Sequence, residues 1–214
     1  MNSPESEVYQ KSKVLYGLYQ AKQHIAKESN CYLVEGYTDV IQMHQAGIQN
    51  VVSSSGTALT PDQVRLIRRL TNKITLLFDG DAAGLRAAIR GVDVILEAGM
   101  HVSICTFPAG EDPDSFVNKN GKNYFIDYSK QNKISIHQFI FNHYKKNTNN
   151  NPSSLAIFDK KLRSIANTIK DNYIKKYVLE YFLEKISELT PHTSQNRKNF
   201  YIKKTKSLET TKKY

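Results

Sequence analysis

The chain has 214 residues, 40% of them hydrophobic, which is typical of a globular protein with one or two domains and excludes wholesale disorder. No apolar run approaches the length of a membrane-spanning helix and the first residues lack an apolar signal segment, so we expect a cytoplasmic protein without membrane contacts. The net charge of +10 is unevenly distributed, with 10 basic and 13 acidic residues in 1–117 but 20 basic and 7 acidic residues in 118–214. The basic second half indicates either contact with polyanions or simply a composition rich in Lys and Asn.

The first half of the chain alternates short apolar runs with helical patterns. Thr38 and Gly47 are suited to cap and end one helix, and Thr60-Pro61 is suited to open another. We therefore expect strands at 31–34, 50–53, 73–78 and 101–107. Helices are expected at 39–46, from residue 61 onward and at 82–98, and the apolar face of the second is formed by Val64, Ile67 and Leu70. This order predicts an α/β fold whose largely parallel sheet of about four strands is flanked by helices.

The second half has a different pattern. After a turn at Asn120-Gly121 we expect no further strand of this kind, but an all-α helical bundle. The first of its helices is expected at 134–144, and the second runs from a cap at Ser153 or Ser154 to residue 169. A third follows a cap at Asp171 and a fourth begins at Thr190-Pro191, with a frayed tail from residue 203. These patterns predict a boundary near residue 130, between an α/β domain at 31–130 and a basic helical subdomain at 131–214.

Three acidic clusters follow predicted strands. Glu35-Gly36 follows the first strand, Asp79-Gly80-Asp81 the third, and Glu111-Asp112-Pro113-Asp114 comes shortly after the fourth. The carboxyl ends of parallel strands meet at one edge of a sheet, where ligands bind. Converging carboxylates repel one another unless a cation compensates, and magnesium prefers hard oxygen ligands. The pattern therefore predicts a divalent metal site at this edge.

Each cluster also has a simpler interpretation. A single Asp-Gly-Asp is common in turns, and an acidic-Pro-acidic stretch, including Asp114, can simply cap a helix. Only the three clusters together favour a metal site. The two cysteines, Cys31 and Cys105, lie in apolar runs and form no CxxC pair, so we expect core residues and no zinc site.

The spacing of Glu35 and Asp79-Gly80-Asp81 resembles the TOPRIM pattern of bacterial primases and several topoisomerases. The finer resemblance, over about residues 2–120, is to bacterial replicative DNA primases. It rests on Asn2-Ser-Pro-Glu5, Leu15-Tyr-Gly-Leu18, Val34-Glu-Gly-Tyr-Thr-Asp39, Ser55-Gly-Thr-Ala-Leu-Thr60, Phe78-Asp-Gly-Asp-Ala-Ala-Gly84 and Pro108-Ala-Gly-Glu-Asp-Pro-Asp114. The resemblance implies a TOPRIM-type sheet, with residues 1–30 as the end of an N-terminal subdomain and a linking helix.

The same resemblance implies roles for individual residues. The implied ligands of two or more Mg²⁺ or Mn²⁺ ions are Glu35, Asp79, Asp81, Asp112 and Asp114, of which the first three are catalytic and Glu35 also transfers a proton. Lys11 matches a position in contact with nucleotide or template. The loop Ser55-Gly56-Thr57 can approach phosphate through backbone N–H groups, or is only a tight turn. Arg86 and Arg90, one helical turn apart, face phosphate or solvent.

The implied activity is RNA primer synthesis on a single-stranded DNA template. A 3′-hydroxyl would attack the α-phosphate of a nucleoside triphosphate, forming an RNA–DNA hybrid and releasing pyrophosphate. The family also carries a zinc ribbon, most of an N-terminal subdomain and a domain that binds the replicative helicase, none of which is recognisable here. We therefore expect a catalytic-core fragment that primes poorly by itself.

Three alternative functions remain open at this stage. A TOPRIM topoisomerase or nuclease shares the acidic pattern, although the Glu-Asp-Pro-Asp motif favours a primase. A non-catalytic TOPRIM interaction module would tend to lose acidic positions that this chain keeps. A basic helical DNA-binding protein explains the charge of the second half but not the carboxylates.

Overall fold

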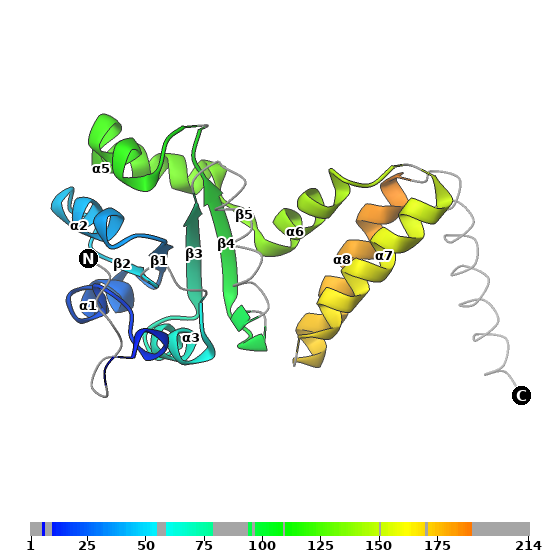
Figure 1. Cartoon of the computed structure of the whole chain (residues 1–214), viewed down its shortest axis with the longest axis horizontal. Coiled ribbons are helices and arrows are strands. Elements are labelled where there is room, and N and C mark those ends of the chain that lie inside the picture. The colour runs from blue at the N-terminus through cyan, green and yellow to red at the C-terminus, as the bar shows by residue number, and fades with distance from the viewer. Residues whose placement is uncertain are drawn as a thin grey trace, which may run out of the picture.

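The computed structural model describes residues 6, 10–54, 59–78, 94–95, 97–108, 110–149, 151–169 and 171–189. They form a five-stranded sheet in the order β2-β1-β3-β4-β5 (Figure 1). The strands are β1 (Cys31–Val34), β2 (Val51–Ser53), β3 (Lys73–Phe78), β4 (His101–Thr106) and β5 (Ile134–Ser135). The first four are parallel and β5 is antiparallel to β4, which confirms the predicted α/β class with a largely parallel sheet. Strand β5 was not expected.

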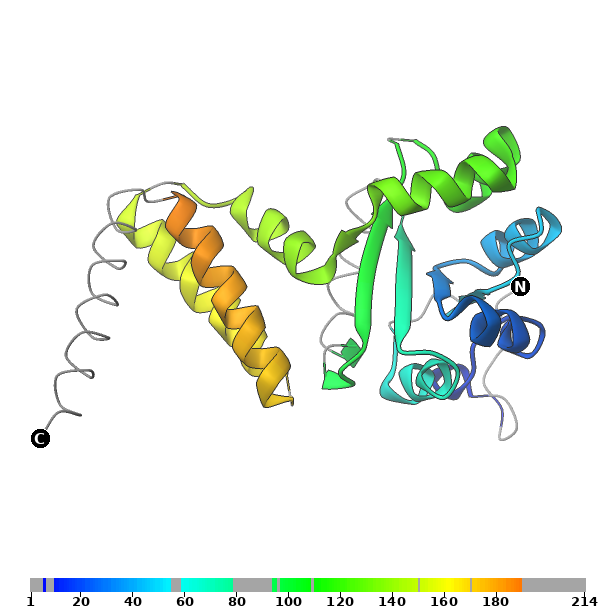
Figure 2. The same ribbon diagram turned by 180° about the vertical axis from the view of Figure 1, so that it is seen from behind.

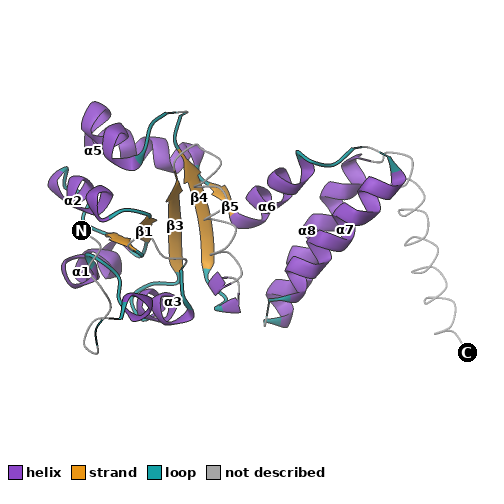
Figure 3. Ribbon diagram, viewed as in Figure 1, coloured by secondary structure: helices purple, strands orange, loops and turns teal. Residues whose placement is uncertain are grey.

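Alternating residues of the strands face two separate hydrophobic clusters, as the two-residue period of a strand requires. In β3, Ile74 and Leu76 belong to one cluster and Leu77 to the other. The helices α2 (Tyr37–Gln45) and α5 (Pro113–Asn132) cover the face of Leu77. The opposite face is covered by α1 (Leu18–Glu28) and α3 (Pro61–Arg68), so that the sheet is enclosed on both sides (Figure 3).

The last three described helices are α6 (Ile136–Lys145), α7 (Pro152–Asn167) and α8 (Asn172–Leu189), and the hairpin of α7 and α8 extends away from the sheet (Figure 2). Phe139, Leu162 and Phe182 in these helices share one hydrophobic cluster with the sheet. The domain boundary near residue 130 stays a prediction. The helix expected from Thr190 and the tail from 203 lie outside the described residues.

Several predicted caps are confirmed and others are wrong. Thr60 caps α3 as expected, and its side chain accepts a 3.2 Å hydrogen bond from the Gln63 N–H. Asp171 accepts hydrogen bonds from the Tyr173 and Ile174 N–H groups at the start of α8. The N-cap of α7 is Asn151 rather than Ser153 or Ser154, because its side chain accepts from the Ser154 N–H at 2.8 Å.

The start of α2 also differs from the prediction. The helix begins at Tyr37 with Gly36 as its N-cap, so the assignment of that role to Thr38 is wrong. The physical reason is that Oδ2 of Asp39 accepts a 3.0 Å hydrogen bond from the Gly36 N–H, which closes the first turn earlier. The helix ends before Gly47, whose φ of 84° is accessible to glycine.

Two further differences concern the middle of the chain. Gly121, expected in a turn, has φ 78° and ψ 173° and produces a kink within α5. Of the helix expected at 82–98, only residues 94, 95, 97 and 98 are described, and the first three of these are helical. No helix in the described ranges is both long and apolar enough to cross a bilayer.

Candidate functional site

The strand register brings Glu35 beside the strand that leads into the Asp-Gly-Asp motif. Strands β1 and β3 are parallel neighbours, and Leu33 pairs with Leu76. Extending that register by two residues places Glu35 level with Phe78, which directly precedes Asp79 in the chain. Adjacent strands lie about 4.8 Å apart, so Glu35 and the end of β3 occupy the same part of the sheet edge. Asp79 and Asp81 themselves lie outside the described residues.

Glu35 is held by the neighbouring strand as well. The buried hydroxyl of Ser53, the last residue of β2, donates a 2.7 Å hydrogen bond to the backbone carbonyl of Glu35. The side chain is partly buried, and its Oε1 is shielded from solvent. A carboxylate with a fixed backbone and limited solvent access is suited to hold a cation.

Two exposed tyrosines flank this strand end. Tyr16 forms an antiparallel bridge with Ser53 through two backbone hydrogen bonds of 2.9 and 3.1 Å. Its ring packs edge-on against Tyr37, two residues after Glu35, with centroids 5.9 Å apart. The two residues are 42% and 41% exposed, so they offer aromatic surface on which a base can stack. The sequence pattern did not single out this pair, although both tyrosines lie within the family motifs given above.

Lys11 lies in the 3-10 helix η1 (Lys11–Lys13), which is anchored on α3. The fully buried side-chain amide of Gln63 donates 2.9 Å hydrogen bonds to the carbonyl oxygens of Lys11 and Val14. Its Oε1 accepts from the Thr60 N–H at 3.0 Å. Gln63 thus sets the position of the backbone that carries Lys11, a role that the sequence did not reveal.

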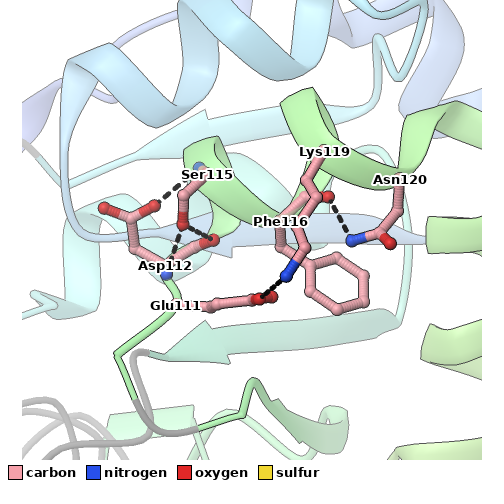
Figure 4. A network of polar contacts seen from close by, with 6 residues as sticks. All are labelled: Glu111, Asp112, Ser115, Phe116, Lys119 and Asn120. Carbon is pink, nitrogen blue, oxygen red and sulfur yellow. Dashed lines mark hydrogen bonds and ion pairs between the residues drawn. The ribbon is translucent and has the colours of Figure 1, made fainter.

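The acidic segment after β4 forms the start of α5 (Figure 4). Oδ1 of Asp112 accepts a 2.7 Å hydrogen bond from the Ser115 N–H, so Asp112 rather than Asp114 is the N-cap. Oδ1 of Asp114 accepts from the Asn118 side chain at 2.6 Å. Glu111 forms a 2.7 Å ion pair with Lys119, and this hydrogen bond raises the pKa of Lys119. The capping alternative therefore holds for Asp112, whose Oδ2 is not used by the cap.

The described residues fit a hard cation in chemistry but do not by themselves complete a site. Glu35 and the Asp112/Asp114 pair supply carboxylate oxygens, which Mg²⁺ and Mn²⁺ prefer. Within the described ranges no three His, Cys, Asp or Glu side chains come together as a metal site, and the central pair Asp79/Asp81 is outside those ranges. The phosphate candidates Ser55, Gly56, Thr57, Arg86 and Arg90 lie outside them too.

The cysteines are core residues, as expected. Cys31 and Cys105 are both buried and unpaired with each other. Burial raises the pKa of both thiols, that of Cys105 to about 11, so both stay protonated at neutral pH. A protonated, buried thiol is a poor metal ligand, and these two residues stabilise the sheet by packing instead.

Comparison with known proteins gives consistent matches. Residues 32–117 match the family model described as Toprim-like. A DNA primase of Clostridium acetobutylicum is 41% identical over 184 residues, which are 82% of this chain and 30% of that protein. The E. coli primase catalytic core superposes with a TM-score of 0.80 and 32% identity, covering 87% of this chain and 60% of that one.

A further solved structure carries nucleic acid. The DnaG primase catalytic domain bound to ssDNA has a TM-score of 0.79 and 31% identity to this chain, and the match covers 86% of this chain and 60% of that one. The chain spans about a third of the length of the curated relatives that it matches. The likeness thus concerns one part of those longer proteins.

Proposed function

The chain carries the Toprim-like core of a bacterial DNA primase, and from that premise we propose that its acidic sheet edge catalyses RNA primer synthesis within the whole protein. The observation that supports this most directly is the β1–β3 register, which sets Glu35 beside the strand that runs into Asp79 and Asp81. A primase core uses divalent metal in general. The finer proposal is that two or more Mg²⁺ or Mn²⁺ ions are held by Glu35, Asp79, Asp81, Asp112 and Asp114.

The bound ions would supply charge neutralisation on the phosphates and a lowered pKa for the attacking hydroxyl. The residues of the chain contribute the rest. Ser53 keeps Glu35 in place through its carbonyl, and Gln63 positions the segment of Lys11. We propose that Lys11 and Arg86 contact phosphate and that the Ser55-Gly56-Thr57 loop presents backbone N–H groups to it. Phosphoryl transfer depends mainly on such positioning and on electrostatics.

The proposed partners follow from the same chemistry. A single-stranded DNA template and nucleoside triphosphates are the substrates, and an RNA–DNA hybrid is the product. The solved DnaG domain bound to ssDNA supports the template as a partner. A contact with the replicative helicase would be made by other parts of the whole protein, which would act in the cytoplasm at the replication fork.

The test has two arms. Calorimetric titration of Mn²⁺ into this chain should show binding that Glu35→Gln and Asp79→Asn each weaken at least about tenfold, because each removes one charged ligand. Primer synthesis by the complete gene product should fall by at least about a hundredfold in the same variants, with Asp127→Asn on the exposed side of α5 as the control. Unchanged priming by Asp79→Asn would defeat the assignment.

A further inference from the structure

A cavity lies at the end of the sheet opposite the candidate metal site. It has a volume of about 600 Å³ and is bordered by Asn30 and Tyr32 at the start of β1 and by Gln49 and Asn50 just before β2. The candidate metal site, in contrast, follows the last residues of these strands. Glu35 is five residues beyond Asn30, which along an extended strand is roughly 16 Å. The cavity is therefore separate from the metal site.

The cavity is strongly basic. Lys27 comes from the last turn of α1, whereas Lys130 and Lys133 come from the end of α5. His24 and Lys122 complete the basic lining, and Glu28 is the one acidic side chain among the lining residues. Within the part of the chain that the structure describes, Lys27, Lys130 and Lys133 form no ion pair, even though Glu28 lines the same cavity.

Lysines gathered without acidic partners repel one another, and an anion in their midst removes that cost. The negative end of a helix dipole also favours a cation in its last turn. That effect accounts for a lysine at each helix end. It does not account for two helix ends from distant parts of the sequence directing their lysines to one cavity.

Hydrogen bonds connect the remaining walls of the cavity. The Tyr32 hydroxyl is hydrogen-bonded to Ser129 Oγ of α5 at 3.1 Å, and the Asn50 amide donates to the Asn30 carbonyl at 2.9 Å. Lys122 donates to the Gly47 carbonyl at 2.8 Å, which ties α5 to the loop before β2. Tyr32, together with Ile48 and Ile126, adds apolar surface to the basic lining. A volume of this size with mixed polar and apolar walls suits a nucleotide-sized ligand.

We propose that this cavity, which we call the lysine cavity, binds a ligand through its phosphate groups, with Lys27, Lys130 and Lys133 as the phosphate contacts. The phosphates belong either to a free nucleotide or to a nucleic-acid strand. A free nucleotide would place its base against Tyr32, Ile48 and Ile126, whereas a strand would thread only its backbone past the lysines. The proposal does not depend on the function assigned to the acidic edge.

The experiment is a calorimetric titration of the chain at low salt in the presence of EDTA, so that a metal-dependent site does not contribute. The probes are inorganic pyrophosphate, adenosine diphosphate and the single strand dT12. The test variant is Lys27→Gln/Lys130→Gln/Lys133→Gln. The matched control, Lys146→Gln/Lys160→Gln/Lys175→Gln, removes the same charge from the helices beyond residue 135. Thermal unfolding checks that both variants remain folded.

We expect saturable pyrophosphate binding that weakens at least about tenfold in the test variant and changes less than about twofold in the control and in Glu35→Gln. Lys130→Arg should retain it, since the charge is kept. Tighter binding of adenosine diphosphate than of pyrophosphate or dT12 assigns the cavity to a free nucleotide, and tighter binding of dT12 assigns it to a strand. Absent pyrophosphate binding, equal affinity in the test variant, or an equal loss in the control overturns the proposal.

Discussion

The hydroxyl of Ser53 donates a 2.7 Å hydrogen bond to the backbone carbonyl of Glu35, and this contact joins the ends of β1 and β2 at the acidic edge of the sheet. Ser53 is fully buried, and its backbone also bridges to Tyr16. One small residue thus connects the candidate metal ligand to the segment that precedes α1. Because the Ser53 side chain is buried and its hydroxyl is engaged with the Glu35 carbonyl, its effect on the site is one of position.

The first prediction concerns Ser53. We expect Ser53→Ala to lower the free energy of unfolding by about 1–2 kcal/mol, because the Glu35 carbonyl loses a buried donor. The same variant should weaken Mn²⁺ binding several-fold, since the Glu35 backbone is released. The control is Thr75→Val on β3, which removes a buried hydroxyl that donates to the Asn30 side chain at the opposite end of the strands. Urea unfolding and calorimetry measure the two effects, and a matching loss of Mn²⁺ affinity in the control would refute the positional role.

The second prediction separates the two roles of Asp112. Asn is as good an N-cap as Asp, so Asp112→Asn should leave stability within about 0.5 kcal/mol, whereas Asp112→Ala should lose about 1 kcal/mol. If Asp112 is also a metal ligand, both variants should bind Mn²⁺ more weakly than the wild type, because both lack the carboxylate charge. If Asp112→Asn binds Mn²⁺ as tightly as the wild type, Asp112 is a helix cap and not a metal ligand.

The third prediction addresses the aromatic pair beside Glu35. Replacing Tyr37 by leucine should weaken binding of a fluorescent single-stranded oligonucleotide at least about fivefold, because base stacking on an aromatic ring is lost. Tyr37→Phe keeps the ring and should bind as the wild type does. Tyr19→Leu on α1 is the control, since Tyr19 is 78% exposed. Fluorescence anisotropy reports the affinities, and equal binding by Tyr37→Leu and Tyr19→Leu would show that the pair does not contact the strand.

The fourth prediction concerns pH and His137. Burial lowers the pKa of His137, whose ring lies beside Tyr181 and Phe182. Among the residues that the structure describes, its Nε2 has no hydrogen-bond partner. At this residue the unfolded chain therefore binds a proton more readily than the folded one. His137 thus lowers the stability of the fold as the pH drops through and below the pKa of a histidine in the unfolded chain, about 6.5. Stability should rise again toward neutral pH, where both states are neutral at this residue.

The measurement is thermal unfolding at pH 7 and pH 5. His137→Phe should show a smaller drop in Tm between the two values than the wild type. His101→Asn, at an exposed position at the start of β4, should retain the full drop. An unchanged pH dependence in His137→Phe would mean that other groups determine the loss of stability at low pH. One such group is the partly buried His143, whose pKa is also lowered by burial and by Lys146.

Much of the fold follows from local chemistry. The bounds of β1 and β3 agree with the prediction because each is a short, mostly apolar run, as expected for strands buried on both faces. Thr60-Pro61 marks the start of α3 because the capping side chain and the proline act within one turn. The comparisons favour a primase core over the alternative functions that the sequence left open.

The errors also have local causes. Strand β5 has two residues, too few for a two-residue period to be visible, and it forms only because Ile134 and Ser135 pair with Ile104 and Ser103. At α2 and α7, several residues in succession can cap a helix, and the outcome depends on which side chain reaches an N–H group.

The place of Glu35 at the end of β1 was predictable because parallel strands end on the same side, while the metal site itself stays a prediction. The supporting contacts around this edge were not predictable. The hydrogen bonds of Gln63 to Lys11 and of Ser53 to Glu35 join residues that are 52 and 18 positions apart. The spacing of apolar residues in the sequence does not indicate such long-range partners. The lysine cavity also depends on helix ends that are far apart in the sequence.

The most direct test of the central claim is a crystal of this chain soaked with Mn²⁺ and measured at the manganese absorption edge. The account predicts an anomalous peak in contact with the carboxylates of Glu35, Asp79 and Asp81, and its loss in Glu35→Gln crystals. A well-ordered edge without such a peak, or a peak that contacts none of these three residues, would contradict it.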